Sequence, residues 1–203
     1  MNRWNQLAKG QSIDKAIESL KRNGINALFV ETGEDAKKKV LELIPHGAQV
    51  MNMTSVTLDT IGLSKEINES GKYVSVRKKL AGMDRATQNL EMQKLGAAPD
   101  WTIGSVHAVT EDGHVLIASN SGSQLPAYVY GASHVIWVVG AQKIVRNTDE
   151  GVKRIYEYVL PLEDERARKA YGIGSGVSKL LIIHKEKIPG RITMIVVNEV
   201  LGF

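Results

Sequence analysis

Residues 117–139 read IASNSGSQLPAYVYGASHVIWVV, two apolar runs with a polar loop between them. The second run, Val135 to Val139, is continuous rather than alternating, which is typical of a strand covered on both faces. Residues 124–130 are predicted to form a short helix that ends at Gly131. A strand, a polar loop, a helix and a second buried strand in this order indicate an α/β fold.

Similar apolar runs recur on both sides of this stretch, and segments with helical spacing lie between them. The other predicted strands cover residues 27–30, 49–53, 180–183 and 192–197. The predicted helices cover residues 13–20, 36–44, 56–67, 152–159 and 163–170, and Pro161 is expected to separate the last two. Alternation of helices with buried strands predicts a mainly parallel sheet flanked by helices.

One segment has a different pattern. Residues 103–110 and 114–119 flank Glu111-Asp112-Gly113, and Asp-Gly is a strong signal for a tight hairpin. We therefore expect one antiparallel hairpin beside the parallel strands. The domain organisation predicted from the sequence is an N-terminal helical arm over residues 1–22 and one α/β domain over residues 23–203.

Composition narrows the range of functions. The 203 residues carry a net charge of +4, with basic residues spread among acidic ones and only 5% aromatics, so nucleic-acid binding is not predicted. The absence of cysteine excludes disulfides, a thiol nucleophile and thiolate-held zinc or iron–sulfur clusters. No apolar run approaches the roughly 20 residues of a membrane span, and no signal segment is recognised. We expect a cytoplasmic protein without a cofactor or a metal site.

The loop after the first apolar run is the leading candidate for a binding site. Ser123 is expected to cap the following helix, and Gly122 allows the backbone to approach a ligand closely. Free N–H groups at such a helix start, together with hydroxyls, suit a phosphate or a carboxylate. The predicted ligand-binding residues in this loop are Asn120, Ser121, Gly122, Ser123 and Gln124.

Two further loops follow predicted parallel strands. Thr54 and Ser55 place hydroxyl groups after the strand at residues 49–53. Lys143 and Arg146 follow the strand at residues 135–139 and offer positive charge to an anion. Ligands of open α/β sheets bind beyond the carboxyl ends of strands, so these four residues complete the predicted anion site.

Acid–base candidates are fewer. His107 and Glu111 lie in the hairpin, where they are considered as a catalytic pair for proton transfer. A histidine in a hairpin also has a purely structural interpretation. No metal-ligand spacing joins the histidines, and no established nucleotide-binding or hydrolase motif is present.

Three stretches carry a family resemblance: GSVHAVTEDGHVLIASNSGSQLPAYVYGASHVIWVVGAQKIV (104–145), LPLEDERARKAYG (160–172) and PGRITMIVVNEVLGF (189–203). They resemble the LUD-domain family, the lactate-utilisation family that includes the LutC-type proteins. This resemblance implies the NagB/RpiA/CoA-transferase-like fold. It also implies a role associated with oxidation of lactate to pyruvate, beside iron–sulfur partner proteins.

The sequence departs from its relatives at two places. Longer relatives have Ala-Glu-Thr-Gly-Thr where this chain has Ser119 to Ser123, so Asn120 replaces a carboxylate. Related short proteins have a cysteine-rich segment where residues 169–179 contain no cysteine. The corresponding loop also lacks the glutamate that CoA transferases of this fold use, which argues against covalent CoA transfer.

Three functional hypotheses remain open at this point. The first is binding of a small anionic metabolite in lactate or related organic-acid metabolism, with or without catalysis. The second is a non-catalytic regulatory or partner subunit of an iron–sulfur oxidoreductase. The third is a phosphosugar isomerase-like enzyme, which rests on fold analogy. The sequence leaves open whether the chain forms a homo-oligomer.

Overall fold

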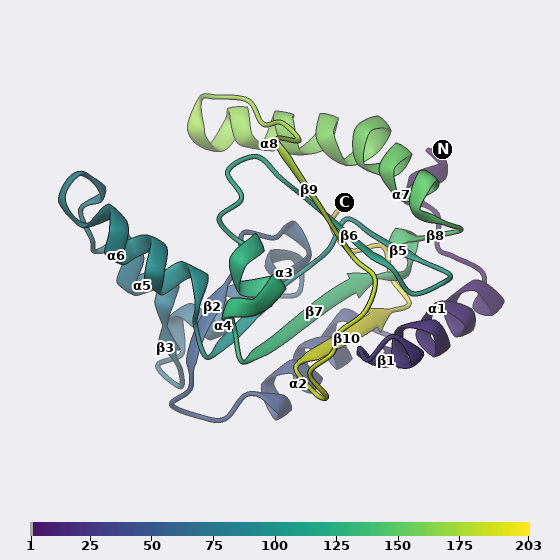
Figure 1. Cartoon of the computed structure of the whole chain (residues 1–203), viewed down its shortest axis with the longest axis horizontal. Helices are drawn as coiled ribbons and strands as arrows, with labels where there is room; N and C mark the ends of the chain where they lie inside the picture. Colours follow the sequence, from purple (N-terminus) through teal and green to yellow (C-terminus); the bar gives the residue numbers. More distant parts are fainter. Residues whose placement is uncertain (1) are drawn as a thin grey trace.

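The computed structural model describes residues 2–203, and Met1 lies outside them. A central sheet of six strands has the spatial order β1-β10-β7-β4-β2-β3, and every neighbouring pair is parallel (Figure 1). This arrangement confirms the predicted parallel sheet. Its strands are β1 (Asn26–Val30), β2 (Gln49–Asn52), β3 (Val74–Ser75), β4 (Trp101–Gly104), β7 (His134–Gly140) and β10 (Ile192–Val197).

A second, smaller sheet has four strands in the order β8-β5-β6-β9. Strand β6 is antiparallel to both β5 and β9, whereas β8 is parallel to β5. The hairpin predicted around Asp112-Gly113 is therefore present as β5 and β6. The strands are β5 (Ala108–Thr110), β6 (Val115–Ser119), β8 (Ile144–Val145) and β9 (Lys179–Ile183).

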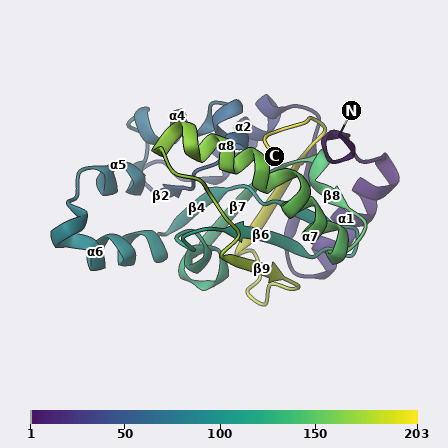
Figure 2. The same cartoon turned by 90° about the horizontal axis from the view of Figure 1, so that it is seen from above.

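Helices α2, α3 and α4 cover the outer face of the central sheet, and the segment from α7 to α8 runs along the second sheet (Figures 1 and 2). The longer ones are α1 (Gly10–Arg22), α2 (Gly33–Leu43), α6 (Arg85–Ala97) and α8 (Leu160–Tyr171). The shorter ones are α3 (Val56–Thr60), α4 (Leu63–Glu69), α5 (Val76–Ala81) and α7 (Thr148–Arg154). Single turns are η1 (Arg3–Asn5) and η3 (Ala141–Lys143), both 3-10, and η2 (Ala127–Gly131) and η4 (Ile155–Val159), both π-helical.

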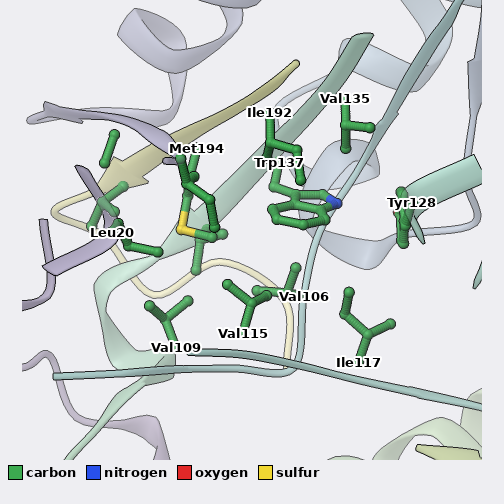
Figure 3. Close-up of a cluster of buried hydrophobic side chains, with 14 of the residues drawn as sticks. Leu20, Val106, Val109, Val115, Ile117, Tyr128, Val135, Trp137, Ile192 and Met194 are labelled. Atoms are coloured by element: carbon green, nitrogen blue, oxygen red, sulfur yellow. The ribbon is translucent and has the colours of Figure 1, made fainter. Parts of the chain in front are cut away.

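Side chains alternate along β7 and so reach both faces of the central sheet. Trp137 packs with Met194 against Val115 of the second sheet, and Figure 3 shows this layer between the sheets. On the opposite face, Ile136 and Val138 pack in one cluster with residues of α2, α3 and α4. The molecule therefore has a helical layer, the central sheet and then the second sheet. The outer face of the second sheet packs on η4 through a third cluster.

The chain changes sheet where the sequence predicted one continuous strand. Ile103 belongs to β4 of the central sheet, whereas Ala108 belongs to β5 of the second sheet. The prediction of a single strand over residues 103–110 is therefore wrong, and Ser105–His107 is the crossing segment. Both halves are apolar because each is buried on its own sheet, so hydrophobicity alone does not reveal the break.

The predicted helix stop at Pro161 is also wrong. Helix α7, the π-helical turn η4 and helix α8 follow one another without interruption from Thr148 to Tyr171. Proline lacks an N–H group, and its ring collides with the carbonyl four residues earlier in a regular α-helix. The wider π-helical turn immediately before Pro161 moves those carbonyls away from the ring. Helix α8 then ends at Gly172, as predicted, with φ +73°.

Three other helical segments differ from expectation. The helix predicted over residues 56–67 is divided at Gly62, which has φ +68°, into α3 and α4. Helices α5 and α6 were not predicted, because no apolar face repeats through residues 76–97. The short helix expected over residues 124–130 is present, as Leu125 and Pro126 followed by the π-helical turn η2, but the Ser123 hydroxyl binds Ser121 and does not cap it.

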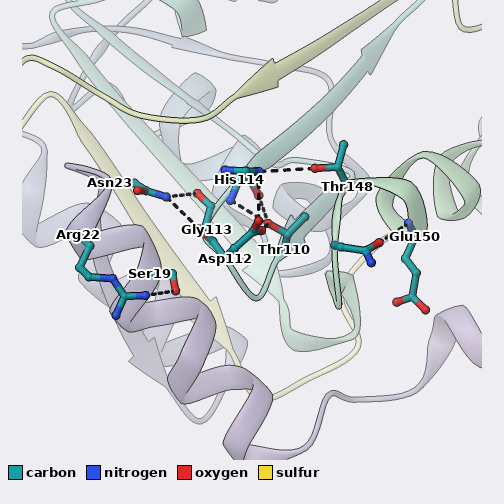
Figure 4. A network of polar contacts seen from close by, with 10 residues as sticks. Ser19, Arg22, Asn23, Thr110, Asp112, Gly113, His114, Thr148 and Glu150 are labelled. Carbon is teal, nitrogen blue, oxygen red and sulfur yellow. Dashed lines mark hydrogen bonds and ion pairs between the residues drawn. The ribbon is translucent and has the colours of Figure 1, made fainter.

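Helix α1 packs on the domain core. Its residues Ile13, Ala16 and Leu20 lie in the same cluster as Trp137. The Asn23 amide donates hydrogen bonds to the Asp112 and Gly113 carbonyl oxygens, at 3.0 and 3.2 Å (Figure 4). These contacts hold the hairpin turn against the end of α1.

His107 joins the crossing segment to its surroundings. Its Nδ1 atom accepts a hydrogen bond from the Ala118 amide at 3.0 Å, and its carbonyl oxygen accepts one from the buried Arg154 guanidinium at 2.6 Å. Burial lowers the pKa of His107 to about 3, and the positive charge of the nearby Arg154 guanidinium adds to the effect. The imidazole is therefore neutral at physiological pH.

Adding a methyl group at Gly113 is expected to destabilise the fold by about 2–5 kcal/mol, the sum of left-handed strain and overpacking. Gly113 has φ +82°, and a Cβ there would lie 2.6 Å from the Ser19 carbonyl carbon and 2.7 Å from the Leu20 nitrogen. Gly47 has φ +79° and no neighbour within 4 Å, so Gly47→Ala carries only the backbone strain of about 1–2 kcal/mol. Urea denaturation of Gly113→Ala and Gly47→Ala measures the difference. Equal losses would contradict close packing of the turn on α1.

Acid is expected to destabilise the protein partly through His107. The folded-state pKa, about 3, is below the ordinary value, so the unfolded chain binds more protons between these values. This contribution is present in full at pH values well above ~6.5 and is lost as the pH falls, by about 3 kcal/mol at pH ~4.5. Urea denaturation across this range should show a shallower pH dependence for His107→Gln. His46→Gln, at an exposed histidine, is the control, and identical slopes for all three proteins would refute the assignment.

Candidate functional site

The carboxyl ends of three adjacent parallel strands bring polar groups together. Lys143 follows β7, Ser105 follows β4, and Thr57 stands near the start of α3, after β2. Carboxyl ends of parallel strands share one edge of a sheet, where α/β proteins commonly bind ligands. We call Thr57, Ser105, Gln142 and Lys143 the edge cluster.

Lys143 is the centre of the edge cluster. The residue is only 2% exposed, and its Nζ atom donates to the Thr57 hydroxyl at 3.1 Å and to the Ser105 hydroxyl at 3.2 Å. Both of these partners are uncharged. Desolvation holds the pKa of Lys143 well below its usual value, and the positive charge of Arg154 lowers it further. No carboxylate among residues 2–203 pairs with Lys143, so its burial favours the neutral amine.

Gln142 and the carboxy-terminal segment complete this arrangement. The Gln142 Nε2 atom donates to the Leu201 carbonyl oxygen at 3.0 Å and to that of Gly202 at 3.3 Å. The Thr57 hydroxyl donates to the same Leu201 oxygen at 3.1 Å. The Gln142 Oε1 atom is buried and has no hydrogen-bond partner within residues 2–203. The edge cluster therefore holds an unused acceptor as well as a buried amine.

A cleft of about 290 Å³ opens at the end of β2, on the other side of α3. Its walls come from the end of β2 and from α3, α4 and α5, and they include Thr54, Asn52 and Arg77. The Arg77 guanidinium donates to the Asn52 carbonyl oxygen at 3.1 Å and to the Thr54 hydroxyl at 2.7 Å. We call this the β2 cleft. Ser55, beside it, caps α3 by accepting a hydrogen bond from the Leu58 amide at 3.3 Å.

The loop at residues 120–124 follows β6 of the second sheet, not a strand of the parallel sheet. The side-chain oxygen of Asn120 accepts a hydrogen bond from Ser178 at 2.9 Å, in the segment that joins α8 to β9. Figure 1 shows these two segments close together. The loop therefore belongs to the second sheet, whereas the edge cluster lies at the carboxyl edge of the central sheet.

Most polar groups of this loop bind one another. Gly122, with φ +85°, donates its amide to the Ser119 hydroxyl at 2.8 Å. The Ser121 hydroxyl donates to that of Ser123 at 3.1 Å, and Gln124 binds Ser119 and the Ala118 carbonyl. These contacts occupy several groups that the sequence had assigned to an anion.

The structure does not bring His107 and Glu111 together. The Glu111 carboxylate accepts hydrogen bonds from Ser12 at 2.8 Å and from Lys15 at 2.9 Å, both on α1. These contacts, Lys15 first, hold the pKa of Glu111 below its usual value, and Arg146 is near enough to contribute. Glu111 thus joins the hairpin to α1, and Arg146 lies beside it rather than in the edge cluster.

Sequence reasoning missed Thr57, Gln142, Asn52 and Arg77. Arg77 was visible only as part of a basic cluster with Lys78 and Lys79. Among residues 2–203 no group of three or more potential metal-ligating side chains is found. No helix in the same range has the length and apolar character needed to cross a bilayer.

Comparison with known proteins places the chain in a family. The model of the LUD domain matches residues 13–197. The chain is similar to the crystal structure, at 1.70 Å resolution, of a DUF162 family protein from Deinococcus radiodurans. The two have a TM-score of 0.58 and 14% identity, over 95% of this chain and 100% of that chain. No curated protein sequence matches the chain.

A second solved structure is the ribose 5-phosphate isomerase from Plasmodium falciparum. Its TM-score is 0.34 and its identity 13%, over 78% of this chain and 80% of that chain, which is too weak to carry an argument. The parallel sheet flanked by helices, the antiparallel hairpin and the likeness to the DUF162 protein confirm the predicted mainly parallel α/β fold. Because the family model covers most of the chain, the protein belongs to the LUD-domain family.

Proposed function

We propose that this LUD-domain protein binds a small organic anion, a 2-hydroxy or 2-keto acid, at the edge cluster. The observation that carries the proposal is the buried amine of Lys143, whose hydrogen-bond partners are the hydroxyls of Thr57 and Ser105. A ligand carboxylate would supply the missing negative charge. The lactate-utilisation association of the family name supports this class of ligand.

The groups around Lys143 suit the rest of such a ligand. The unpaired Gln142 Oε1 atom can accept a hydrogen bond from a 2-hydroxyl group. Entry requires the segment at Leu201 and Gly202 to move, because its carbonyl oxygens bind Gln142 and Thr57. Proton transfer beside a carbonyl would use the neutral Lys143 amine, since Glu111 is paired with Lys15 on α1.

Lys143→Met is expected to weaken binding of lactate or pyruvate by about ten-fold or more, the effect of losing one charge-assisted hydrogen bond. Isothermal titration calorimetry measures the affinity. Arg146→Met is the matched control and should bind normally, because Arg146 is exposed and lies beside Glu111. Equal affinity of the Lys143→Met and wild-type proteins would exclude this site.

The same titration tests the ionisation of Lys143. An anion next to the amine raises its pKa, so binding takes up a proton between the pKa values of the free and bound states. Affinity should then fall as the pH rises through this range, and the measured heat should depend on the buffer. Sugar phosphates in the same panel separate this proposal from an isomerase-like function, which predicts binding of the sugar phosphate instead.

A second candidate function is that of a partner subunit for an iron–sulfur oxidoreductase. Helix α6 has no buried residue, and Figures 1 and 2 both place it at the end of the molecule opposite α1. Leu90 on this helix is 65% exposed, and Tyr130 on the neighbouring turn η2 is 81% exposed. Exposed apolar groups of this kind are typical of protein contact surfaces.

Co-expression with an iron–sulfur oxidoreductase tests this candidate. The wild-type chain should co-purify with the cluster-containing partner, and the double variant Leu90→Glu, Tyr130→Glu should not. Phe29→Glu, which alters an exposed apolar residue of the edge strand β1, should co-purify like the wild type. Identical behaviour of the double variant and the wild type would remove α6 and η2 as the docking surface.

A further inference from the structure

The β2 cleft contains buried polar groups that are not part of the edge cluster and are typical of a ligand site. Asn52 lines it and is 1% exposed, yet its Oδ1 atom has no hydrogen-bond partner among residues 2–203. The Ser64 hydroxyl oxygen, also in the wall, is buried and unpaired in the same part of the chain. Buried polar atoms normally have partners, so two unpaired oxygens in the wall of one cleft support a site for a polar ligand there.

We propose that the β2 cleft is a second binding site, for a small polyhydroxylated monoanion of the sugar-acid type. Arg77 would bind the anionic end. Two of its five N–H groups are used, one on the Asn52 carbonyl oxygen and one on the Thr54 hydroxyl, which fixes the guanidinium at the end of β2. The remaining N–H groups are available for a carboxylate.

The other wall residues suit hydroxyl groups. Asn52 Oδ1 and the Ser64 oxygen are acceptors, and the carboxylates of Asp59 and Glu69 accept hydrogen bonds as well. The cleft wall contains two positive side chains, Arg77 and Lys65, and the two carboxylates already named, so its formal net charge is zero. A dianion such as a phosphate ester would therefore meet local repulsion, whereas a monoanion with several hydroxyls satisfies both sets of groups.

The β2 cleft is separate from the edge cluster, and the inference goes beyond the proposed function. Thr57 on α3 binds Lys143, whereas Asp59, two residues later, lines the cleft. Neither Lys143 nor Ser105 is part of the cleft wall. Binding in the cleft should consequently survive Lys143→Met, so failure of one proposal does not imply failure of the other.

Titration calorimetry with D-gluconate as the probe tests the cleft, with propionate, D-glucose and inorganic phosphate as comparison ligands. Gluconate should bind at least about ten-fold more tightly than propionate, which lacks hydroxyls, and glucose, which lacks charge. Arg77→Met should lower gluconate affinity about ten-fold or more, while Lys78→Met, at an adjacent exposed residue outside the wall, should not. Tighter binding of phosphate or propionate, or no binding of gluconate at millimolar concentration, would overturn the proposal.

The variant Asn52→Leu distinguishes a ligand-binding role of Asn52 from a purely structural role. Replacing a buried, unpaired amide by an apolar side chain of similar size should keep or raise the melting temperature. The same variant should lose gluconate affinity, because the acceptor inside the cleft is gone. A lower melting temperature with unchanged gluconate affinity would show that Asn52 serves the fold alone and would overturn its role in the site.

Discussion

Trp137 fills the space between the two sheets and makes an edge-to-face contact with Tyr128, with ring centroids 5.5 Å apart. The chain leaving β4 must pass this layer to reach the second sheet. It does so directly after Gly104, where a Cβ atom would lie 1.8 Å from the Tyr128 hydroxyl oxygen. Only glycine fits beside that ring, and this contact fixes where the crossing segment begins. Ser105 and His107 are thereby positioned near Lys143.

The edge cluster follows from this crossing. Ser105 leaves the central sheet at the carboxyl end of β4, and Lys143 follows β7, the strand that pairs with β4. Segments from α3 and from the carboxy-terminal residues then exclude water from the amine. A charged ammonium group loses its hydration in such surroundings, which costs free energy. The packing that builds the edge cluster therefore also favours the neutral form of Lys143.

The sequence predicted those elements whose structure depends on short segments of the chain. Continuous apolar runs predicted β1, β2, β7, β9 and β10, and the central strands β7 and β10 are buried along almost their whole length, as such runs indicate. The break at Ser105 was not predictable, since both halves of the run are buried. Lys143 was predicted as an anion-binding charge, but its burial depends on Thr57, which is 86 positions away in the sequence. Arg77 could not be assigned, because α5 and α6 have no repeating apolar face and no helix was expected there.

The pairing of β1 with β10 has a consequence for synthesis on the ribosome. Asn26 is in register with Thr193, and among residues 2–203 β10 is the one strand that pairs with β1. Until residues 192–197 emerge, β1 lacks its partner and β7 has one exposed edge. Pairing across so long a stretch is slow, and exposed strand edges promote aggregation. The nascent chain is therefore expected to depend on chaperones until β10 pairs with β1 on one side and β7 on the other.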